Sequence, residues 1–428
     1  MRFQTLSEWL DWQQQLHPKS IELGLERVSQ VFDRLSLGKV ANQIITIAGT
    51  NGKGSTVAYY ETWLKNTGFR VGSYTSPHIL HYNERIRIDA QSVTDDKLCQ
   101  AFAAIDEARD QTPLTYFEFG TLAAMYLMHQ QQVDIAIFEV GLGGRLDAVN
   151  IIDADLAHIT MIGLDHQDWL GDTRELIGFE KAGILRENGR AIYNDPKPVS
   201  TVIEQMRLLN VDSSILGADY EYSLIEHHLM NWRSGDLSLH LQPPLQGAHQ
   251  ALNISGVLAG LNALGYLDGV DAEIIIDRFK GLNCAGRLQQ VESQLAATVW
   301  LDVGHNEDAA KVISDFLKQK KRNMSDQGRI YILLGMLGDK NSPAFVGKFS
   351  SEVDQWWLMG LDCERGMSAS EISHQVGESI QIGQVFENAA RALEHAMSSL
   401  NNQDILLVTG SFFSVEATLK TPYLNSAT

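Results

Sequence analysis

The sequence contains few cysteines and has no long apolar run. Its 428 residues include 3 cysteines, Cys99, Cys284 and Cys363, and no CxxC pair. Isolated cysteines do not form a disulfide framework or a zinc site, and they fit a reducing compartment. The longest mostly apolar stretch, ISGVLAGLNALGYL, is too short and interrupted to span a bilayer, and the N-terminus lacks a signal-peptide core. We therefore expect a cytoplasmic protein with no membrane partner.

Positive charge is also scarce. The chain has 34 Lys and Arg against 53 Asp and Glu, which gives a formal net charge of -19. Nucleic-acid-binding surfaces need clustered Lys and Arg, so we expect no nucleic-acid partner. A small anionic ligand remains compatible with the composition, because one local site can be positive on an acidic protein.

The chain length and the apolar pattern predict two α/β domains. Apolar runs such as QIITIAG and VDIAIFEVGLGG alternate with helical patterns at 55–68, 96–109 and 117–131. This alternation predicts a doubly wound, mostly parallel sheet. Short alternating runs around Ser234 and Gly235 predict a small antiparallel hairpin. The α/β rhythm restarts after 281–292, so we expect a first domain over 1–285 and a second, Rossmann-like domain over 286–428.

The segment GTNGKGST, residues 49–56, has the context of a phosphate loop. It follows an apolar strand and precedes a helix, so its backbone N–H groups can face an anion and Lys53 can reach terminal phosphates. Only Thr50 and Asn51 separate its first Gly from the Gly-Lys pair, and Gly54 follows the lysine. The common P-loop has four intervening residues and Ser or Thr after Lys. Whether Ser55 or Thr56 faces a metal stays open, and the alternative is a Gly-rich turn with a solvated lysine.

GTNGKGST resembles the phosphate loop of the Mur ligase superfamily, in the folate branch of dihydrofolate synthases and folylpolyglutamate synthases. The Mur peptidoglycan ligases share the short spacing, whereas Gly54 is characteristic of the folate branch. The resemblance implies a P-loop ligase of folate biosynthesis and one-carbon metabolism that uses ATP and one or two Mg²⁺ ions. It implies ATP contacts for the loop residues Gly49, Thr50, Asn51, Gly52, Lys53, Gly54 and Ser55.

Three strand ends carry candidate magnesium ligands. Ser76, Glu139 and His166 each lie at or just after the end of an expected strand. The carboxyl ends of strands in an open α/β sheet meet in one crevice. Glu139 offers the hard oxygen that Mg²⁺ prefers, whereas His166 has a structural hydrogen bond as an equal alternative. The resemblance implies that all three bind magnesium.

Lys181 lies in FEKAGI, on an expected helix after the His166 loop. Its simplest interpretation is a surface lysine beside Glu180. FEKAGI matches the family segment in which this lysine is carbamylated, and a carbamate there is able to hold a second Mg²⁺. The resemblance thus adds Lys181 to the catalytic and metal-binding set.

Two stretches, SIELGLERV and LTYFEFGTLAA, separate the folate branch from the Mur branch. Tyr116 and Phe117 offer rings for a flat pterin and Glu118 an acceptor for its N–H groups, although these residues taken alone favour packing at a helix N-terminus. Arg27 is expected either to pair with an anionic substrate or to lie on the surface. The resemblance implies that dihydropteroate is lined by Ser20, Ile21, Glu22, Leu23, Thr115, Tyr116, Phe117, Glu118, Leu146, Asp147 and Ala148.

Further family motifs occur in the second half of the chain. GAHQALN and CAGRLQ supply Asn253 and Arg287, and LDVGHNEDAA supplies Asp302, all implied to contact ATP. His305 is implied to position the incoming glutamate, and Ser411 in VTGSFFSV to bind it. Gly304, Glu307 and Asn341 depart from the family's Ala, Pro and Asp. These matches cover about residues 20–415.

The expected activity joins L-glutamate to 7,8-dihydropteroate and to the glutamate tail of reduced folates through an acyl phosphate. We expect a monomer that closes about 281–292. A chain with only one of the two activities is an alternative, as is a Mur-type peptidoglycan ligase. A nucleotide-binding regulator is a third alternative, although it does not explain a second domain with Asp302, His305 and Ser411.

Overall fold

The computed structural model describes residues 2–19, 21–225 and 229–424. It divides into two compact units. The first comprises 1–78, 82–244 and 251–283, and the second comprises 79–81, 245–250 and 284–428. The predicted α/β fold, with a mostly parallel sheet, a small antiparallel sheet and a second α/β domain, is confirmed. Among the described residues, no helix is long and apolar enough to cross a membrane.

Eight strands form the main sheet of the first unit, in the order β4-β3-β2-β5-β1-β6-β7-β8. The strands are β1 Gln43–Ala48, β2 Val71–Tyr74, β3 Ile86–Ile88, β4 Gln91–Ser92, β5 Ile135–Glu139, β6 Leu156–Ile159, β7 Arg190–Tyr193 and β8 Asp212–Ile215. All neighbours from β2 to β8 are parallel, and β3 and β4 add an antiparallel edge. The carboxyl ends of β1, β2, β5 and β6 therefore lie along the same edge of the sheet.

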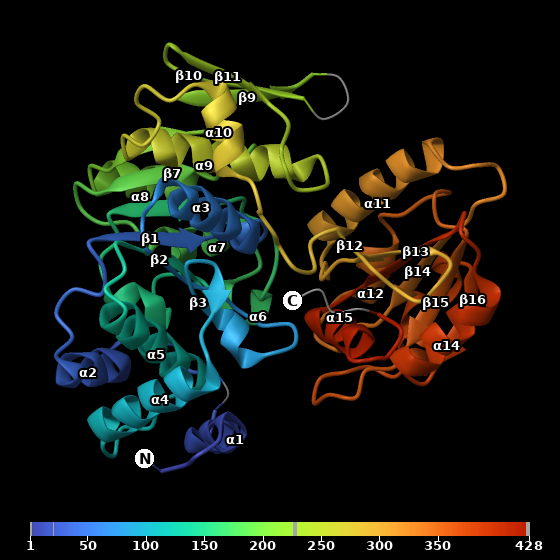
Figure 1. Cartoon of the computed structure of the whole chain (residues 1–428), viewed down its shortest axis with the longest axis horizontal. Coiled ribbons are helices and arrows are strands. Elements are labelled where there is room, and N and C mark those ends of the chain that lie inside the picture. Colours follow the sequence, from blue (N-terminus) through green and yellow to red (C-terminus); the bar gives the residue numbers. More distant parts are fainter. Residues whose placement is uncertain (1, 20, 226–228, 425–428) are drawn as a thin grey trace. The chain divides into compact units, whose positions relative to one another are not determined.

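Helices cover this sheet and extend beyond it. They are α1 Leu6–Leu16, α2 Glu26–Leu35, α3 Lys53–Thr67, α4 Asp95–Arg109, α5 Tyr116–Gln130, α6 Gln167–Leu170, α7 Arg174–Ala182, α8 Ser200–Leu208, α9 His249–Ala263 and α10 Ala272–Arg278, with 3-10 turns η1 Tyr82–Arg85 and η2 Ala148–Ile151. Helices α1, α2, α4 and α5 pack side by side (Figure 1). Helix α1 begins with a capping box formed by Thr5 and Glu8, whose spacing suits this arrangement.

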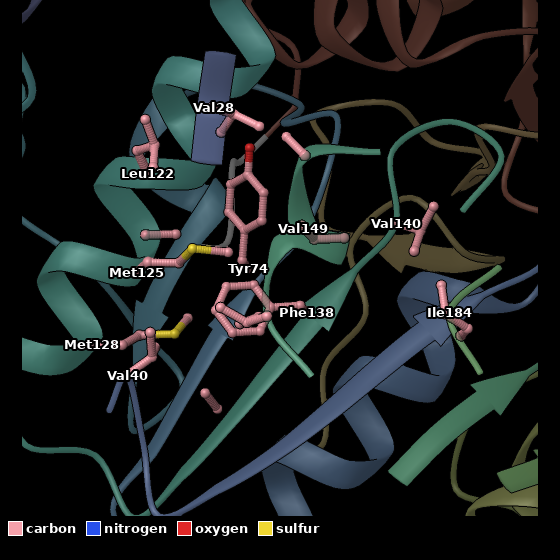
Figure 2. Close-up of a cluster of buried hydrophobic side chains, with 14 of the residues drawn as sticks. Val28, Val40, Tyr74, Leu122, Met125, Met128, Phe138, Val140, Val149 and Ile184 are labelled. Atoms are coloured by element: carbon pink, nitrogen blue, oxygen red, sulfur yellow. The ribbon is translucent and has the colours of Figure 1, made fainter. Parts of the chain in front are cut away.

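The core of the first unit lies between α5 and the sheet. Figure 2 shows Leu122, Met125 and Met128 of α5 facing Tyr74 of β2 and Phe138 of β5. These side chains are almost fully buried. Burying each such side chain contributes roughly 1.5–3 kcal/mol, so this packing fixes the strand ends that carry the candidate site.

The predicted hairpin around Ser234 and Gly235 is confirmed. It joins β10 Met230–Ser234 to β11 Leu237–Leu241, and β9 Tyr220–Leu224 completes a three-stranded antiparallel sheet. The indole of Trp232 is fully buried and donates to the Ser255 carbonyl oxygen at 3.1 Å, which attaches this sheet to α9.

The second unit has a six-stranded sheet in the order β12-β13-β17-β14-β15-β16. Its elements are β12 Gln289–Val291, β13 Thr298–Leu301, α11 Glu307–Arg322, β14 Ile330–Leu334, α12 Ser342–Val346, β15 Gln355–Met359, α13 Ala369–Val376, η4 Gly377–Ser379, β16 Ile382–Phe386, α14 Ala389–Ser399, β17 Ile405–Thr409 and α15 Phe412–Leu419. Only β12 is antiparallel to its neighbour. Ile79, from a short segment far upstream, lies in the hydrophobic core of this unit with Val303.

Candidate active site

The loop between β1 and α3 begins and ends with two conformationally constrained glycines. Gly49 has φ 149° and Gly52 has φ 92°. A Cβ on Gly49 would lie 1.7 Å from the Thr160 hydroxyl oxygen, and one on Gly52 would lie 2.5 Å from Asn253 Oδ1. Gly52 caps α3 without a side-chain hydrogen bond, so the first N–H groups of a fifteen-residue helix have no cap of that kind. Such groups suit an anion.

Hydrogen bonds attach this loop to the segment that follows β6. Thr50 N donates to the Met161 carbonyl at 2.9 Å, and Gly163 N donates to Thr50 Oγ1 at 2.9 Å. Thr160 Oγ1 donates to the Asn51 carbonyl at 2.8 Å. The phosphate loop and the chain leading to His166 are therefore one connected structure. Thr160 was not predicted from sequence, and only its place at a strand end pointed to it.

Ser76 and Glu139 are brought together. Glu139 ends β5 and is 5% exposed, and its Oε2 accepts a hydrogen bond from Ser76 N at 3.3 Å. Ser76 follows β2 and precedes Pro77 through a cis peptide bond. A buried carboxylate beside a hydroxyl at the phosphate-loop edge is a donor set that fits a hard divalent cation.

His166 has a less enclosed position. It has φ 51° and directly precedes α6. Its side chain is 43% exposed, with Nε2 4.0 Å from Asp165 Oδ2. No group of three or more His, Cys, Asp or Glu side chains that could hold a metal occurs in the described part of the chain. The predicted ligand set contains only Glu139 and His166 of those residue types, so its metal-binding role stays a prediction.

Lys181 is buried, so the interpretation as a surface lysine is wrong. The residue is 5% exposed on α7, and its Nζ donates to the Gly49 carbonyl oxygen at 2.9 Å. Burial, with a smaller contribution from the nearby Lys53, lowers the pKa of Lys181 to about 7, whereas Asp165 and Asp147 oppose the change. A substantial fraction of this amine is therefore neutral near pH 7.

The segments expected to line a pterin are connected in the structure. Gly24 N donates to the Leu146 carbonyl at 3.4 Å, which joins the stretch after residue 20 to Leu146–Ala148. Ser20 itself lies outside the described residues. Asp147 is buried and accepts hydrogen bonds from Leu142 N at 2.8 Å and Val149 N at 3.0 Å. Burial raises the pKa of Asp147 to about 6, although these hydrogen bonds and Lys181 oppose the change.

Arg27 does not lie on the surface but forms an internal ion pair. Its Nε lies 2.9 Å from each carboxylate oxygen of Glu118, and its Nη1 donates to Glu22 at 2.9 Å. Glu118 is 3% exposed and also forms the capping box of α5 with Thr115. Arg27 thus connects Glu22 of the first pterin-lining stretch to Glu118 of the second.

The aromatic pair at the start of α5 is half-buried. A Cβ on Gly141 would lie 2.6 Å from the Phe117 ring, so this ring packs directly on the backbone after β5. Phe117 also lies 5.9 Å from Tyr74, between ring centroids. Only a glycine at position 141 allows Phe117 this position. Ile21, Leu23 and Tyr116 keep partial exposure.

In the second unit, Asp302 is buried at the end of β13. Its carboxylate accepts hydrogen bonds from Leu288 N at 2.9 Å and Gly304 N at 2.8 Å. Burial raises the pKa of Asp302, and Arg287 opposes this change. The Arg287 guanidinium lies 5.5 Å from the centre of the Phe412 ring. Asp302 thereby holds the backbone next to Arg287.

The residues predicted to bind the substrate glutamate lie in different environments. His305 Nδ1 lies 3.0 Å from the Val303 carbonyl oxygen, and its side chain is half-buried. Ser411 is 2% exposed and caps α15 by accepting from Ser414 N at 3.0 Å. Asn341, at the position where the family has Asp, caps α12 by accepting from Ala344 N at 3.0 Å. The roles of His305 and Ser411 toward glutamate stay predictions.

Comparison with known proteins is consistent with this arrangement. A family model described as Mur ligase middle domain matches residues 47–261, and one described as Mur ligase, glutamate ligase domain matches 286–412. The dihydrofolate synthase/folylpolyglutamate synthase of Escherichia coli is 39% identical over 419 residues, which cover 96% of this chain and 94% of the relative. That of Haemophilus influenzae is 36% identical over 430 residues and covers 96% of each chain.

Solved structures agree with these matches. Escherichia coli FolC in complex with DHPP and ADP aligns with a TM-score of 0.88 and 37% identity over 97% of each chain. The bifunctional folylpolyglutamate synthase/dihydrofolate synthase of Yersinia pestis, complexed with AMPPNP and a Mn ion, aligns with a TM-score of 0.87 at 37% identity over 97% of each chain. This chain therefore belongs to the Mur ligase family, in its dihydrofolate synthase/folylpolyglutamate synthase branch.

Proposed function

We propose that this chain is an ATP-dependent, ADP-forming ligase with two acceptors. It joins L-glutamate to the carboxylate of 7,8-dihydropteroate and to the glutamate tail of reduced folates. The observation that carries the proposal is the shared position of three features: the Gly49–Lys53 loop, buried Lys181 bonded to Gly49, and Ser76 bonded to Glu139. The relatives named for both activities support the same pair of substrates.

The reaction needs a carboxylate that is activated and then captured by an amine. A carboxylate oxygen of the acceptor attacks the γ-phosphorus of ATP, a new P–O bond forms, and ADP leaves with the bridging oxygen. The glutamate amine then attacks the acyl carbon, loses a proton and expels phosphate, leaving an amide. Positioning and charge neutralisation supply most of the catalysis in such phosphoryl transfers.

The chain's own groups take definite parts in these steps. The N-terminus of α3 and Lys53 would hold the phosphates, and Asn253 would contact the nucleotide from beside Gly52. Ser76, Glu139 and His166 would hold Mg²⁺, with a carbamylated Lys181 available for a second ion. When bound, the metal neutralises phosphate charge and orients the oxygens. Arg287 and Asp302 would serve ATP, while His305 and Ser411 would serve glutamate.

Pterin binding would fall to the stretches that Arg27 and the Gly24–Leu146 hydrogen bond connect. A cytoplasmic location, a monomeric state and domain closure during turnover stay predictions. The assignment of ATP and pterin to residues 1–285 and of glutamate to 286–428 is likewise part of this proposal.

Phosphate release is the direct test. Purified protein with ATP, Mg²⁺ and L-glutamate should release phosphate with dihydropteroate and with tetrahydrofolate, assayed side by side. Lys53→Ala should abolish turnover while circular dichroism and melting temperature stay near wild type. Activity only with one acceptor would restrict the proposal to a single synthase, and activity only with a UDP-linked precursor would assign a peptidoglycan ligase. Nucleotide binding without glutamate-dependent phosphate release would favour the regulator.

A further inference from the structure

Arg85 is a buried cation with no carboxylate partner. The residue is 8% exposed at the end of η1. Its Nε donates to His78 Nδ1 at 2.8 Å and its side chain is also hydrogen-bonded to Tyr74, but among the described residues no carboxylate lies within ion-pair distance. Arginine does not lose its proton in proteins, so this site holds a permanent positive charge. An isolated buried charge is costly, which makes the missing anion informative.

Several other arginines of the first unit are paired with a carboxylate, which Arg85 lacks. The nearest nitrogen-to-oxygen distances are 2.9 Å for Arg27 and Glu118, 3.0 Å for Arg87 and Glu61, 2.7 Å for Arg109 and Asp106, and 2.8 Å for Arg174 and Asp195. Arg87, which is paired with Glu61, lies only two residues after Arg85, in β3. Of the two arginines that are buried in the described part of the chain, Arg85 and Arg109, only Arg85 lacks a carboxylate.

The groups around Arg85 are aromatic rings and hydroxyls. Its guanidinium carbon lies 5.3 Å from the centre of the Tyr82 ring and 5.5 Å from that of Tyr116. These cation–π contacts compensate part of the buried charge. The Tyr74 hydroxyl belongs to the same cluster: burial raises the pKa of Tyr74 to about 12, and the positive charge of Arg85 and its hydrogen bond to Tyr74 oppose this change.

A second unsatisfied donor lies in the same cluster. The Tyr82 hydroxyl is buried and has no hydrogen-bond partner in the part of the chain that the structure describes. A Cβ on Gly120 would lie 2.4 Å from this hydroxyl oxygen and 3.2 Å from that of Tyr74, so both hydroxyls converge over Gly120. A buried hydroxyl without a partner destabilises the folded protein, and an acceptor on a ligand would remove that cost. Among the described residues, the cluster therefore has a cation and an unpaired hydroxyl but no anionic acceptor.

The position of the cluster indicates which acceptor it takes. The Arg85 carbonyl oxygen accepts a hydrogen bond from Thr75 N at 2.9 Å, directly before Ser76 of the candidate metal site. Its side chain contacts Tyr116 of the candidate pterin site. Arg85 thus lies between Tyr116, which would contact the heterocycle, and Ser76, which would hold the metal at the phosphates. In an acid that has a flat heterocycle at one end and is phosphorylated on the carboxylate at the other, this is the place of that carboxylate.

We infer that Arg85, with the Tyr82 hydroxyl, binds the benzoate carboxylate of dihydropteroate and holds it toward the γ-phosphate. The inference rests on the proposed function and adds a specific residue to it. The planar guanidinium presents paired N–H donors that match a carboxylate, and a pair of such charge-assisted bonds orients both oxygens. The cation offsets the charge that the carboxylate brings into a buried site next to ATP.

A binding comparison tests this contact without relying on turnover. The probes are pteroic acid and its carboxamide, measured by calorimetry with a non-hydrolysable ATP analogue and Mg²⁺ present. Wild type should prefer the carboxylate by at least about 30-fold, as expected for charge-assisted bonds to a buried cation. In Arg85→Met that preference should fall to within about threefold, and Arg85→Lys should recover part of it.

The matched control is Arg109→Met, which removes another buried arginine, 9% exposed and paired with Asp106. It should keep the wild-type preference. Retention of the preference in folded Arg85→Met would overturn the inference. Equal affinity of wild type for acid and carboxamide would also overturn it, and this measurement decides even if the variant does not fold. Phosphate release by wild type is measured separately. If wild type releases no phosphate with any folate acceptor, the proposed function is wrong. If it releases phosphate but Arg85→Met keeps the preference for the carboxylate, only this inference is wrong.

Discussion

Lys53 and Lys181 donate to the same carbonyl oxygen. Both Nζ atoms bond Gly49 O, at 3.0 Å and 2.9 Å, although the two residues lie on different helices. Two ammonium groups this close repel each other, and burial of Lys181 adds to the cost, so Lys181 is the one that loses its proton more easily. The phosphate loop therefore holds an amine of lowered pKa, that of Lys181, next to Lys53.

A neutral amine at position 181 predicts carbamate formation that depends on pH. Only the unprotonated amine attacks CO₂, and the folded pKa of about 7 means that this form increases as pH rises through 7. With ¹³C-bicarbonate, a carbamate signal in the ¹³C NMR spectrum should grow between about pH 6 and about pH 8. Lys181→Met should lack that signal. A signal that persists in the variant would place the carbamate elsewhere, and no signal in wild type would remove Lys181 from the metal site.

Gly52→Ala should weaken ATP binding by displacing Asn253. The new Cβ would lie 2.5 Å from Asn253 Oδ1, so the amide must move. We expect the KM for ATP to rise at least about tenfold, equivalent to about 1.4 kcal/mol. Gly68→Ala is the matched control, because Gly68 ends the same helix at φ 105° with nothing within 4 Å of its Cβ position. Gly68→Ala should lower the melting temperature, because alanine disfavours a positive φ, and should leave the KM for ATP unchanged. Similar KM values for both variants would contradict the prediction.

Glu118→Gln should destabilise the protein and weaken dihydropteroate binding. The change removes the charge that Arg27 faces, inside a buried capping box. We expect a loss of about 1–3 kcal/mol in unfolding free energy, measured by urea denaturation. Glu8→Gln is the control, since Thr5 and Glu8 form the same capping box on an exposed helix. Its effect should be much smaller, and equal effects would mean that capping, not the ion pair, accounts for the loss.

Asp147 should make stability fall as pH rises from about 4 to about 6. Its folded pKa of about 6 exceeds the ordinary value of 3.8, so the folded state holds a proton that the unfolded chain has released in this range. The contribution is full below pH 3.8 and is lost as pH passes 6. The melting temperature of Asp147→Asn should vary less with pH over this interval than that of wild type. Parallel pH profiles would show that Asp147 is not the group concerned.

The sequence predicted the elements better than the partners of their side chains. Helix α3 begins at Lys53 rather than Ser55, because Gly52 has the positive φ that lets the chain turn directly into the helix. The antiparallel edge formed by β3 and β4 was not predicted, since three and two residues are too few for a clear alternation. Both phosphate-loop glycines and the β5-end carboxylate lie where their motifs indicated.

Burial and pairing across the chain were beyond sequence reasoning. Nothing in FEKAGI distinguishes a lysine on the surface from one bonded to Gly49, 132 residues away. Arg27 and Glu118 are separated by 91 residues, and only the packing of α2 and α5 makes them partners. The absence of a carboxylate beside Arg85 is a property of three-dimensional surroundings, so no local pattern reports it.

The second unit is built from three separate segments, so it cannot be exchanged between relatives as one continuous segment. Ile79 is 5% exposed within its core, and a Cβ on Gly286 would lie 3.1 Å from the Ile79 side chain. A fragment starting at Cys284 would leave this position empty beside Val303 and would also lack the segment 245–250. A chimera made with one junction would therefore pack Ile79 from one parent against core residues from the other parent. In evolution, substitutions at position 79 are constrained by residues more than half the chain away.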